Sequence, residues 1–536
     1  MKKRLLLLAA IASTGWACTD KFADINSNGT PNGSQSIGHF FNIGQRFLAL
    51  ETNIVICSST NAYQFNENLT GQPYARYLTI TKSDWNVQNF GVFNAPDNWL
   101  NALFNDQMTN VYSAWFEIKN LNDKGEVPAV AWAWAELLRV AAVQRTTDMY
   151  GPLPYSKIKE GTGALYVRYD TQEEVYAGLF ADLDAALDGL RNYVASNSGI
   201  SSLKDYDVVY GGDFSRWIRF GNSLKLRMAL RISYADPVKA AQYAAEALDP
   251  AKGGVIESNA DIACITRSNV TNPLHIMWND YQDSRAAAEL ITYLNGYQDP
   301  RLDKYFVPVA TGSNAGRYAG MRVGIAIQSH SWACDNFSVP RVEKSDPVLL
   351  FSAAEVAFLK AEALACHNWS LPVVSGTAED CYNEGIRLSF EQWGLARTAA
   401  DAYLVDNVRT QASYTDDPGN GVSAVSTITV KWDDAASVET KLERIITQKW
   451  IALYPLGLEG WSEHRRTGYP RFFNVPVNRS SDNTLSTHGA SRIPYGPSEQ
   501  LNNPTNYLDA VTRDLGGRDG YGVRLWWDAK NPKAGW

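Results

Sequence analysis

Helical periodicity dominates the hydrophobic pattern of this 536-residue chain. In the run "AVAWAWAELLRVAAVQRTTDMYG" apolar side chains recur at the spacing of one helix face, at Trp134, Leu137, Leu138, Ala141 and Ala142. The pattern predicts a helix that begins at Pro128, since proline favours the first helical position, and that ends before Gly151 and Pro152.

Two further helix starts carry capping signals. Thr171 and Glu174 open "TQEEVYAGLFADLDAALDGL", and Ser352 and Glu355 open "SAAEVAFLKAEALAC", both with the spacing of a capping box. In such a box the hydroxyl accepts from an N–H of the first turn, and the glutamate accepts from the N–H of the capping residue. We therefore expect helices that start at both places.

One predicted helix pair has the length of a tetratricopeptide repeat. The span from Trp217 to Pro250 is 34 residues long, and its aromatic, glycine, alanine and terminal proline positions loosely follow that repeat. A second pair, 352–366 and 377–394, resembles it. Such pairs stack because neither can bury its apolar stripe alone. The predicted fold class is mainly α-helical, with about four helix pairs packed against a loop-rich half that has few short strands.

Three long segments lack this periodicity and are predicted as loops: residues 57–100, 260–345 and 395–440. They are rich in Asn, Gly, Thr and aromatic residues. Within the last one, "VSTITVKW" (Val425–Trp432) alternates like a short strand. Long ordered loops in a compact protein usually carry function, so we expect the ligand site in these segments.

The first residues have the pattern of a secretion signal. Basic residues at 2–4 precede an apolar run well below the roughly 20 residues that span a bilayer. Small residues before Cys18 predict cleavage there and lipidation of that cysteine, with an ordinary signal peptide as the alternative. We divide the chain into a signal peptide (1–17), a lipid-anchored tether (18–40) and a single helical domain (41–536).

Charge and motifs narrow the classes of function. The net charge is −8 and no run of Lys or Arg follows the leader, which argues against a nucleic-acid partner. The five cysteines after Cys18 are scattered without a CxxC pattern, so they indicate neither a disulfide framework nor a zinc site. HExxH, GxSxG and P-loop motifs are absent from the sequence. We expect no catalytic residue, metal or cofactor, with a surface glycoside hydrolase as the alternative because only folding brings paired carboxylates together.

Aromatic residues point to a saccharide ligand. Flat rings pack against the C–H faces of sugars, while Asn, Asp and Arg side chains bond the hydroxyl groups. Rings on helices are expected in the core, whereas rings in loops are candidates for binding. The predicted binding residues lie in two loop regions, which form one platform if they converge: Trp85, Phe93, Trp99, Trp278, Tyr281 and Arg285.

Several stretches, taken in order, resemble the signatures of the SusD/RagB-like family of outer-membrane nutrient-binding lipoproteins. They are "DMYGPLPYS" (148–156), "YDTQEEVY" (169–176), "GGDFSRWIRFGNSLKLRMALRIS" (211–233), "DPRLDKYF" (299–306), "SAAEVAFLKAEA" (352–363), "IITQKWIALYPLGLEGWSEHRRTGYP" (445–470) and "RIPYGPSEQLNNPTNY" (492–507). The resemblance implies a non-catalytic, cell-surface lid on the outer membrane. Such a lid captures an oligosaccharide, or in some members a peptide, and delivers it to a SusC-like TonB-dependent transporter.

Arg465 and Arg466 in "RRTGYP" permit two interpretations. Two guanidinium groups beside Tyr469 would suit an anion. Alternatively, they satisfy carbonyls and carboxylates that lock the C-terminal loops onto the helices. We favour the second interpretation because the resembled family has this stretch whatever the ligand.

Overall fold

The computed structural model describes residues 43–161, 166–197, 203–266, 271–369, 371 and 374–533. The predicted signal peptide, the tether and the lipidation site Cys18 lie outside the described residues. Within the described ranges, none of the helices combines the length and apolar character that a membrane crossing needs.

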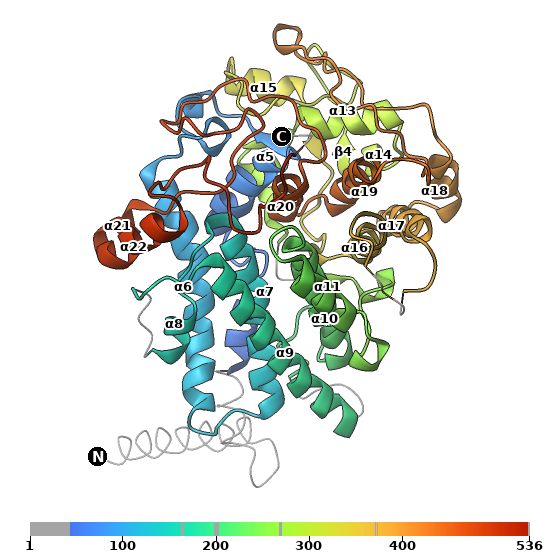
Figure 1. Cartoon of the computed structure of the whole chain (residues 1–536). Coiled ribbons are helices and arrows are strands. Elements are labelled where there is room, and N and C mark those ends of the chain that lie inside the picture. The colour runs from blue at the N-terminus through green and yellow to red at the C-terminus, as the bar shows by residue number, and fades with distance from the viewer. Residues whose placement is uncertain are drawn as a thin grey trace, which may run out of the picture.

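The helical half is one continuous array (Figure 1). Its main helices are α6 (Asp97–Asn122), α7 (Ala129–Tyr150), α9 (Gln172–Ser196), α10 (Phe214–Arg231), α11 (Pro237–Ala247), α16 (Ala353–Cys366), α17 (Ala378–Gln392), α19 (Val438–Leu453) and α20 (Gly457–Thr467). Neighbours along the chain pack as pairs, namely α6 with α7, α10 with α11, α16 with α17 and α19 with α20. Contacts of α9 with α7 and α10, and of α16 with α10 and α19, join the pairs. The predicted fold class is confirmed.

Short elements make up the other half. They include the helices α4 (Thr60–Tyr63), α5 (Gln72–Tyr74), α12 (Pro273–His275), α13 (Ala288–Tyr297), α14 (Leu302–Tyr305), α15 (His330–Asn336), α18 (Arg397–Leu404), α21 (Pro497–Asn502) and α22 (Pro504–Asp514), the π-helical turns η1 (Gln64–Gly71) and η6 (Ile276–Asp280), and the 3₁₀ turns η2 (Ser83–Trp85) and η3 (Phe90–Val92). In Figure 1, α13 and α15 lie at the edge opposite the lower ends of α6 and α9.

The described strands form three two-stranded antiparallel sheets. Strand β1 (Leu78–Ile80) pairs with β3 (Ser284–Ala286), β2 (Ala263–Ile265) with β6 (Val348–Phe351), and β4 (Phe306–Val307) with β5 (Val339–Pro340). Every pair joins segments far apart in the sequence, so the sheets fasten the loop-rich half together.

Helix starts follow their sequence signals closely. Pro128 is the N-cap of α7 rather than its first residue, and the helix ends at Gly151, which has φ 89°. Thr171 and Glu174 form the predicted capping box of α9. At α16 only half of the box exists, because Ser352 Oγ accepts from the Glu355 N–H whereas the Glu355 carboxylate binds Arg227 at 2.6 and 2.7 Å.

The predicted loops contain more regular structure than expected. Residues 57–100 include η1, α5 and the start of α6, the 260–345 segment holds α13, and α18 lies in 395–440. In the first segment the polar residues face inward: Glu67 pairs with Arg145 at 2.6 Å, and the Gln72 amide donates to the Pro455 carbonyl at 2.7 Å. A buried polar turn with distant partners has the composition of a loop, which is why periodicity failed to identify it.

The strand predicted at Val425–Trp432 is wrong, although its alternation is real. Ser426, Ile428, Val430 and Trp432 are buried and the residues between them are more exposed. No neighbouring strand accompanies the segment among the described residues. Its carbonyls are satisfied by side chains instead, since Tyr297 Oη donates to Ile428 O at 3.0 Å and Tyr382 Oη to Val430 O at 2.6 Å.

Candidate functional site

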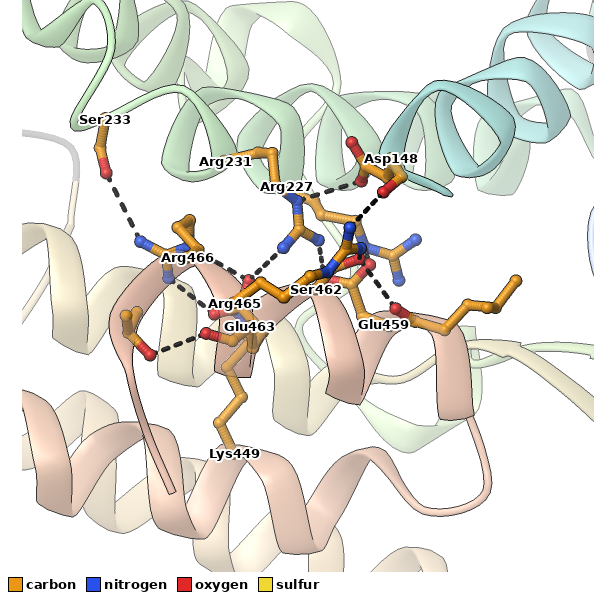
Figure 2. A network of polar contacts seen from close by, with 12 residues as sticks. Asp148, Arg227, Arg231, Ser233, Lys449, Glu459, Ser462, Glu463, Arg465 and Arg466 are labelled. Atoms are coloured by element: carbon orange, nitrogen blue, oxygen red, sulfur yellow. Dashed lines mark hydrogen bonds and ion pairs between the residues drawn. The ribbon is translucent and has the colours of Figure 1, made fainter. Parts of the chain in front are cut away.

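A dense cluster of charged side chains lies where α7, α10, α16, α19 and α20 meet (Figure 2). Arg231 pairs with Asp148 at 3.1 Å and with Glu463 at 2.9 Å, and Lys449 lies 3.1 Å from Glu463. All four side chains are at most 4 % exposed. We call this cluster, with Arg227, Glu355, Glu362, Glu459, Arg465 and Arg466, the buried ion network.

The two arginines of "RRTGYP" belong to this network. Arg466 binds Glu362 through both terminal nitrogens at 2.6 and 2.7 Å, and Glu463 at 2.6 Å. Arg465 donates to the carbonyls of Asp148 and Ser491 at 2.6 and 3.0 Å. Both guanidinium groups are 0 % exposed. The scaffold interpretation is therefore confirmed, and the anion-clamp interpretation is wrong because both guanidinium groups are fully buried and already bind carbonyls or carboxylates, so a solvent anion cannot reach them.

A second cluster contains aromatic rings that are partly exposed to solvent, and it lies next to strands β1 and β3. The register of β1 and β3 places Ile80 opposite Ser284, so the chain leaving β1 runs beside the chain entering β3. Lys82 Nζ then donates to the carbonyl of Tyr281 at 3.1 Å. The two loop regions that carry the predicted binding residues therefore converge.

A third segment joins them on the same side. The Asn86 amide donates to the Ile327 carbonyl and its oxygen accepts from the Ile327 N–H, both at 2.8 Å. His330 Nδ1 lies 3.4 Å from the carbonyl of Thr81. The first turn of α15, which carries Trp332, is thereby held against the 81–86 segment, which contains η2.

The accessible groups of the three segments form what we call the aromatic surface: Lys82, Trp85, Trp278, Tyr281, His330 and Trp332. Tyr281 is 38 % exposed, the Lys82 side chain is 31 % exposed, and the other four are half-buried. Trp278 is oriented by its indole N–H, which donates to the Val342 carbonyl at 3.1 Å. Half-buried rings, among which Trp278 is fixed by a hydrogen bond, offer a preformed face to a ligand.

The other three predicted binding residues are buried. Phe93, 1 % exposed, packs against the ring of Tyr74. Trp99 is 8 % exposed and meets Trp85 edge to face with centroids 5.1 Å apart, so it supports that ring. Arg285 is 5 % exposed.

Arg285 positions the backbone around the aromatic surface. Its guanidinium donates to the carbonyls of Ser284 at 2.8 Å, Cys334 at 3.4 Å and Trp278 at 3.5 Å. Burial lowers the pKa of this guanidinium below its ordinary value. The side chain therefore links η6, β3 and α15 and leaves ligand contact to the rings.

The electrostatics of the aromatic surface are mild. Lys82 lies 3.3 Å from Asp283, a carboxylate that also accepts from the Gln64 amide. Burial raises the pKa of Asp283 although both partners favour its charged form. With its cation already paired, the surface suits a neutral polar ligand with apolar faces, such as a saccharide.

Sequence reasoning missed three members of the aromatic surface, Lys82, His330 and Trp332. The stretch "SHSWACDN" gave a usable signal, since it places a tryptophan and a histidine in a segment predicted as a loop. For Lys82 no signal was available, because its role comes from hydrogen bonding to a residue almost 200 positions away. Among the described residues no group of His, Cys, Asp and Glu is arranged to hold a metal ion.

Comparison with known proteins supplies the family. A sequence profile described as "Susd and RagB outer membrane lipoprotein" matches residues 24–528. The chain belongs to the SusD-like family. No curated protein matches it significantly.

Solved structures of other SusD-like proteins agree over nearly the whole chain. A SusD homologue from Bacteroides uniformis is 37 % identical, with a TM-score of 0.84 and coverage of 91 % of this chain and 100 % of that one. A homologue from Bacteroides thetaiotaomicron is 36 % identical, with a TM-score of 0.83 and coverage of 91 % and 99 %. A chitin-binding homologue from Flavobacterium johnsoniae is 35 % identical, with a TM-score of 0.85 and coverage of 92 % and 99 %.

Proposed function

We propose that this SusD-like protein captures oligosaccharides at the cell surface and passes them to a SusC-like TonB-dependent transporter. Capture takes place on the aromatic surface, without turnover. The observation that supports the proposal is the convergence of the segments around η2, η6 and α15, each of which carries a ring that is not buried. Lipidation of Cys18 would anchor the protein to the outer membrane.

The chemistry of the aromatic surface favours a neutral glycan. Rings such as Tyr281 and Trp85 pack against sugar C–H faces, and exposed amide and hydroxyl groups nearby can bond to the hydroxyls. A relative that shares 35 % of its residues with this chain is described as chitin-binding. Oligomers of N-acetylglucosamine are therefore the first ligands to test, beside malto-oligosaccharides, other neutral glycans and peptides.

Isothermal titration of wild-type protein and Tyr281→Ala tests the site. We expect the loss of one stacking ring to weaken oligosaccharide binding about tenfold, close to 1.4 kcal/mol. Trp85→Ala should weaken binding in the same way. The matched control is Tyr166→Ala, because Tyr166 is 54 % exposed but lies outside the aromatic surface. Equal affinities for Tyr281→Ala and Tyr166→Ala would remove the aromatic surface from the binding site.

Reducing-end measurements on the same mixtures separate capture from hydrolysis. We expect the bound oligosaccharide to keep its length, whereas reducing ends that accumulate with time would identify a glycoside hydrolase. Binding of peptides in place of glycans would retain the capture role and change the cargo. Co-purification from outer membranes with a TonB-dependent barrel, lost on Cys18→Ala, would support delivery to a transporter.

A further inference from the structure

A cavity is built from residues outside the aromatic surface. It has a volume of about 740 Å³, which lies within the range of small-molecule sites, about 300–1,000 Å³. Its walls come from the ends of the helix pairs and from the loop-rich half, including α4, the start of α10, β2, α12, β6, the C-terminal end of α17 and the turn between α19 and α20. We call it the seam pocket.

Three uncharged residues of the seam pocket carry polar atoms without a hydrogen-bond partner. Asn259 Oδ1, Gln392 Oε1 and Trp393 Nε1 are buried and have no hydrogen-bond partner among the described residues. The Asn259 amide nitrogen is already bound, since it donates to the Leu388 carbonyl at 3.0 Å. The uncharged residues therefore leave two acceptors and one donor for a ligand. A buried polar atom costs free energy until it finds a partner, so this set favours occupancy by hydroxyl groups, which both donate and accept.

Three of the four charged residues of the wall are already engaged, and the fourth, Arg341, is exposed. Glu67 binds Arg145 at 2.6 Å, and Arg216 donates to the Ala260 carbonyl at 2.5 Å. The Asp346 carboxylate accepts from the Glu343 N–H at 2.9 Å. At Glu67, Arg216 and Asp346 a charged ligand would have to compete with these contacts, whereas a neutral one would not.

The remaining wall is apolar and contains an indole. Ile262, Leu274, Val348 and Leu456 line the seam pocket, and each is buried or half-buried. Trp393 is braced by Tyr305, with ring centroids 4.6 Å apart. Apolar walls beside a braced ring and a few polar atoms match the two chemical faces of a sugar, its C–H bonds and its hydroxyls.

We propose that the seam pocket is a second saccharide site, which takes a neutral sugar of one or two rings. Gln392, Asn259 and Trp393 are its recognition residues. Only the choice of ligand class rests on the proposed function, because no residue of the aromatic surface lines the seam pocket. A protein with both sites holds a long glycan outside and a short one within.

Titration calorimetry and ligand-observed NMR with four probes test the seam pocket: glucose, N-acetylglucosamine, maltose and chitobiose. We expect at least one to bind wild-type protein at millimolar concentration. Gln392→Leu keeps the side-chain size but removes the acceptor, so affinity for that probe should fall about tenfold or more. The matched control is Gln500→Leu, the same substitution at an exposed glutamine of α21, with unchanged affinity.

Two variants distinguish binding in the seam pocket from binding on the aromatic surface. Tyr281→Ala should leave the affinity for the short probe unchanged, and Gln392→Leu should leave the affinity for long oligosaccharides unchanged. Asn259→Leu repeats the test, and only variants with the wild-type unfolding midpoint are compared. The second site is overturned if none of the four probes binds, if both variants bind as wild type does, or if Tyr281→Ala abolishes binding of the short probe.

Discussion

The buried ion network and the aromatic surface use similar side chains in opposite ways. In the network every arginine named above contacts at least one carboxylate or carbonyl, and Arg465 also lies over the Trp461 ring at 3.5 Å. On the aromatic surface Tyr281 is 38 % exposed and the other rings are half-buried. Charge density identifies the structural centre of this molecule, and ring exposure identifies its candidate binding face.

The contrast teaches how to judge a conspicuous sequence motif. "RRTGYP" is the more noticeable stretch, yet its arginines join α20 to α16 and to the C-terminal segment. A charge brought into the interior loses hydration and must be paired there, so a cluster of buried charges constrains the fold strongly. A side chain that contacts a ligand needs the opposite arrangement: its protein partners hold it in place but leave one face exposed.

Arg466→Ala is expected to produce the largest effect. It would remove the two-nitrogen contact to the buried Glu362 and one of the cationic partners of Glu463, so the free energy of unfolding should fall by about 3–5 kcal/mol. The control, Arg191→Ala, removes a pair in which Asp188 is 66 % exposed, and should cost less than about 1 kcal/mol. Urea denaturation measures both. Similar losses in the two variants would show that the buried ion network does not stabilise the fold.

Phe93→Ala tests whether the predicted binding residues divide into a buried group and an exposed group. We expect a loss of about 3–5 kcal/mol in the free energy of unfolding, because a 1 % exposed ring leaves a cavity against Tyr74. Phe93 also has φ 59°, a strained value for a large side chain that alanine would retain. Tyr281→Ala should change stability by less than about 0.5 kcal/mol. If Phe93→Ala unfolds at the wild-type urea concentration, the ring is not part of the core.

Acid should weaken the buried ion network. Burial alone would raise the pKa of Glu362, but the Arg466 guanidinium outweighs it and lowers that pKa from 4.5 to about 2. A lowered pKa in the folded state contributes stability that is complete above pH 4.5 and is lost as the pH falls toward 2. The contribution amounts to roughly 3 kcal/mol.

Denaturation of wild type and Glu362→Gln at stepped pH measures this term. The wild-type free energy of unfolding should fall more steeply than that of the variant between pH 4.5 and 2. Other carboxylates titrate in both proteins, so their contributions cancel in the difference. Parallel curves would mean that Arg466 does not hold the pKa of Glu362 down.

The sequence predicted the helical pairs well because their signals are local. The capping box at Thr171 and the glycine that ends α7 act within one turn of their own helix. The strand expected at Val425–Trp432 failed because alternation reports burial, whereas a strand also needs a neighbouring strand to bond with. The inward-facing polar residues of η1, such as Glu67, were unpredictable since Arg145 is 78 positions away.

The aromatic surface was predicted only in part, because some of its signals are local and others depend on the fold. Trp85 and Tyr281 were found because tryptophan and tyrosine in irregular segments are rarely all needed for packing. The sequence could not separate them from Phe93 or Trp99, which lie in the same stretch but are buried. Exposure depends on what folds over a residue, and local composition does not contain that information.

Lys82→Met is expected to have the smallest effect and sharpens the description of the ligand. The ammonium group orients the Tyr281 backbone at 3.1 Å and pairs with Asp283, so its loss should loosen the loop and weaken binding of a neutral oligosaccharide about threefold. Binding by wild type should also be insensitive to salt, since screening acts on charges and a neutral glycan has none. Titrations at low and high NaCl measure both effects. A loss as large as that of Tyr281→Ala, together with affinity that falls as salt rises, would instead make Lys82 a direct contact to an anionic glycan and the aromatic rings its support.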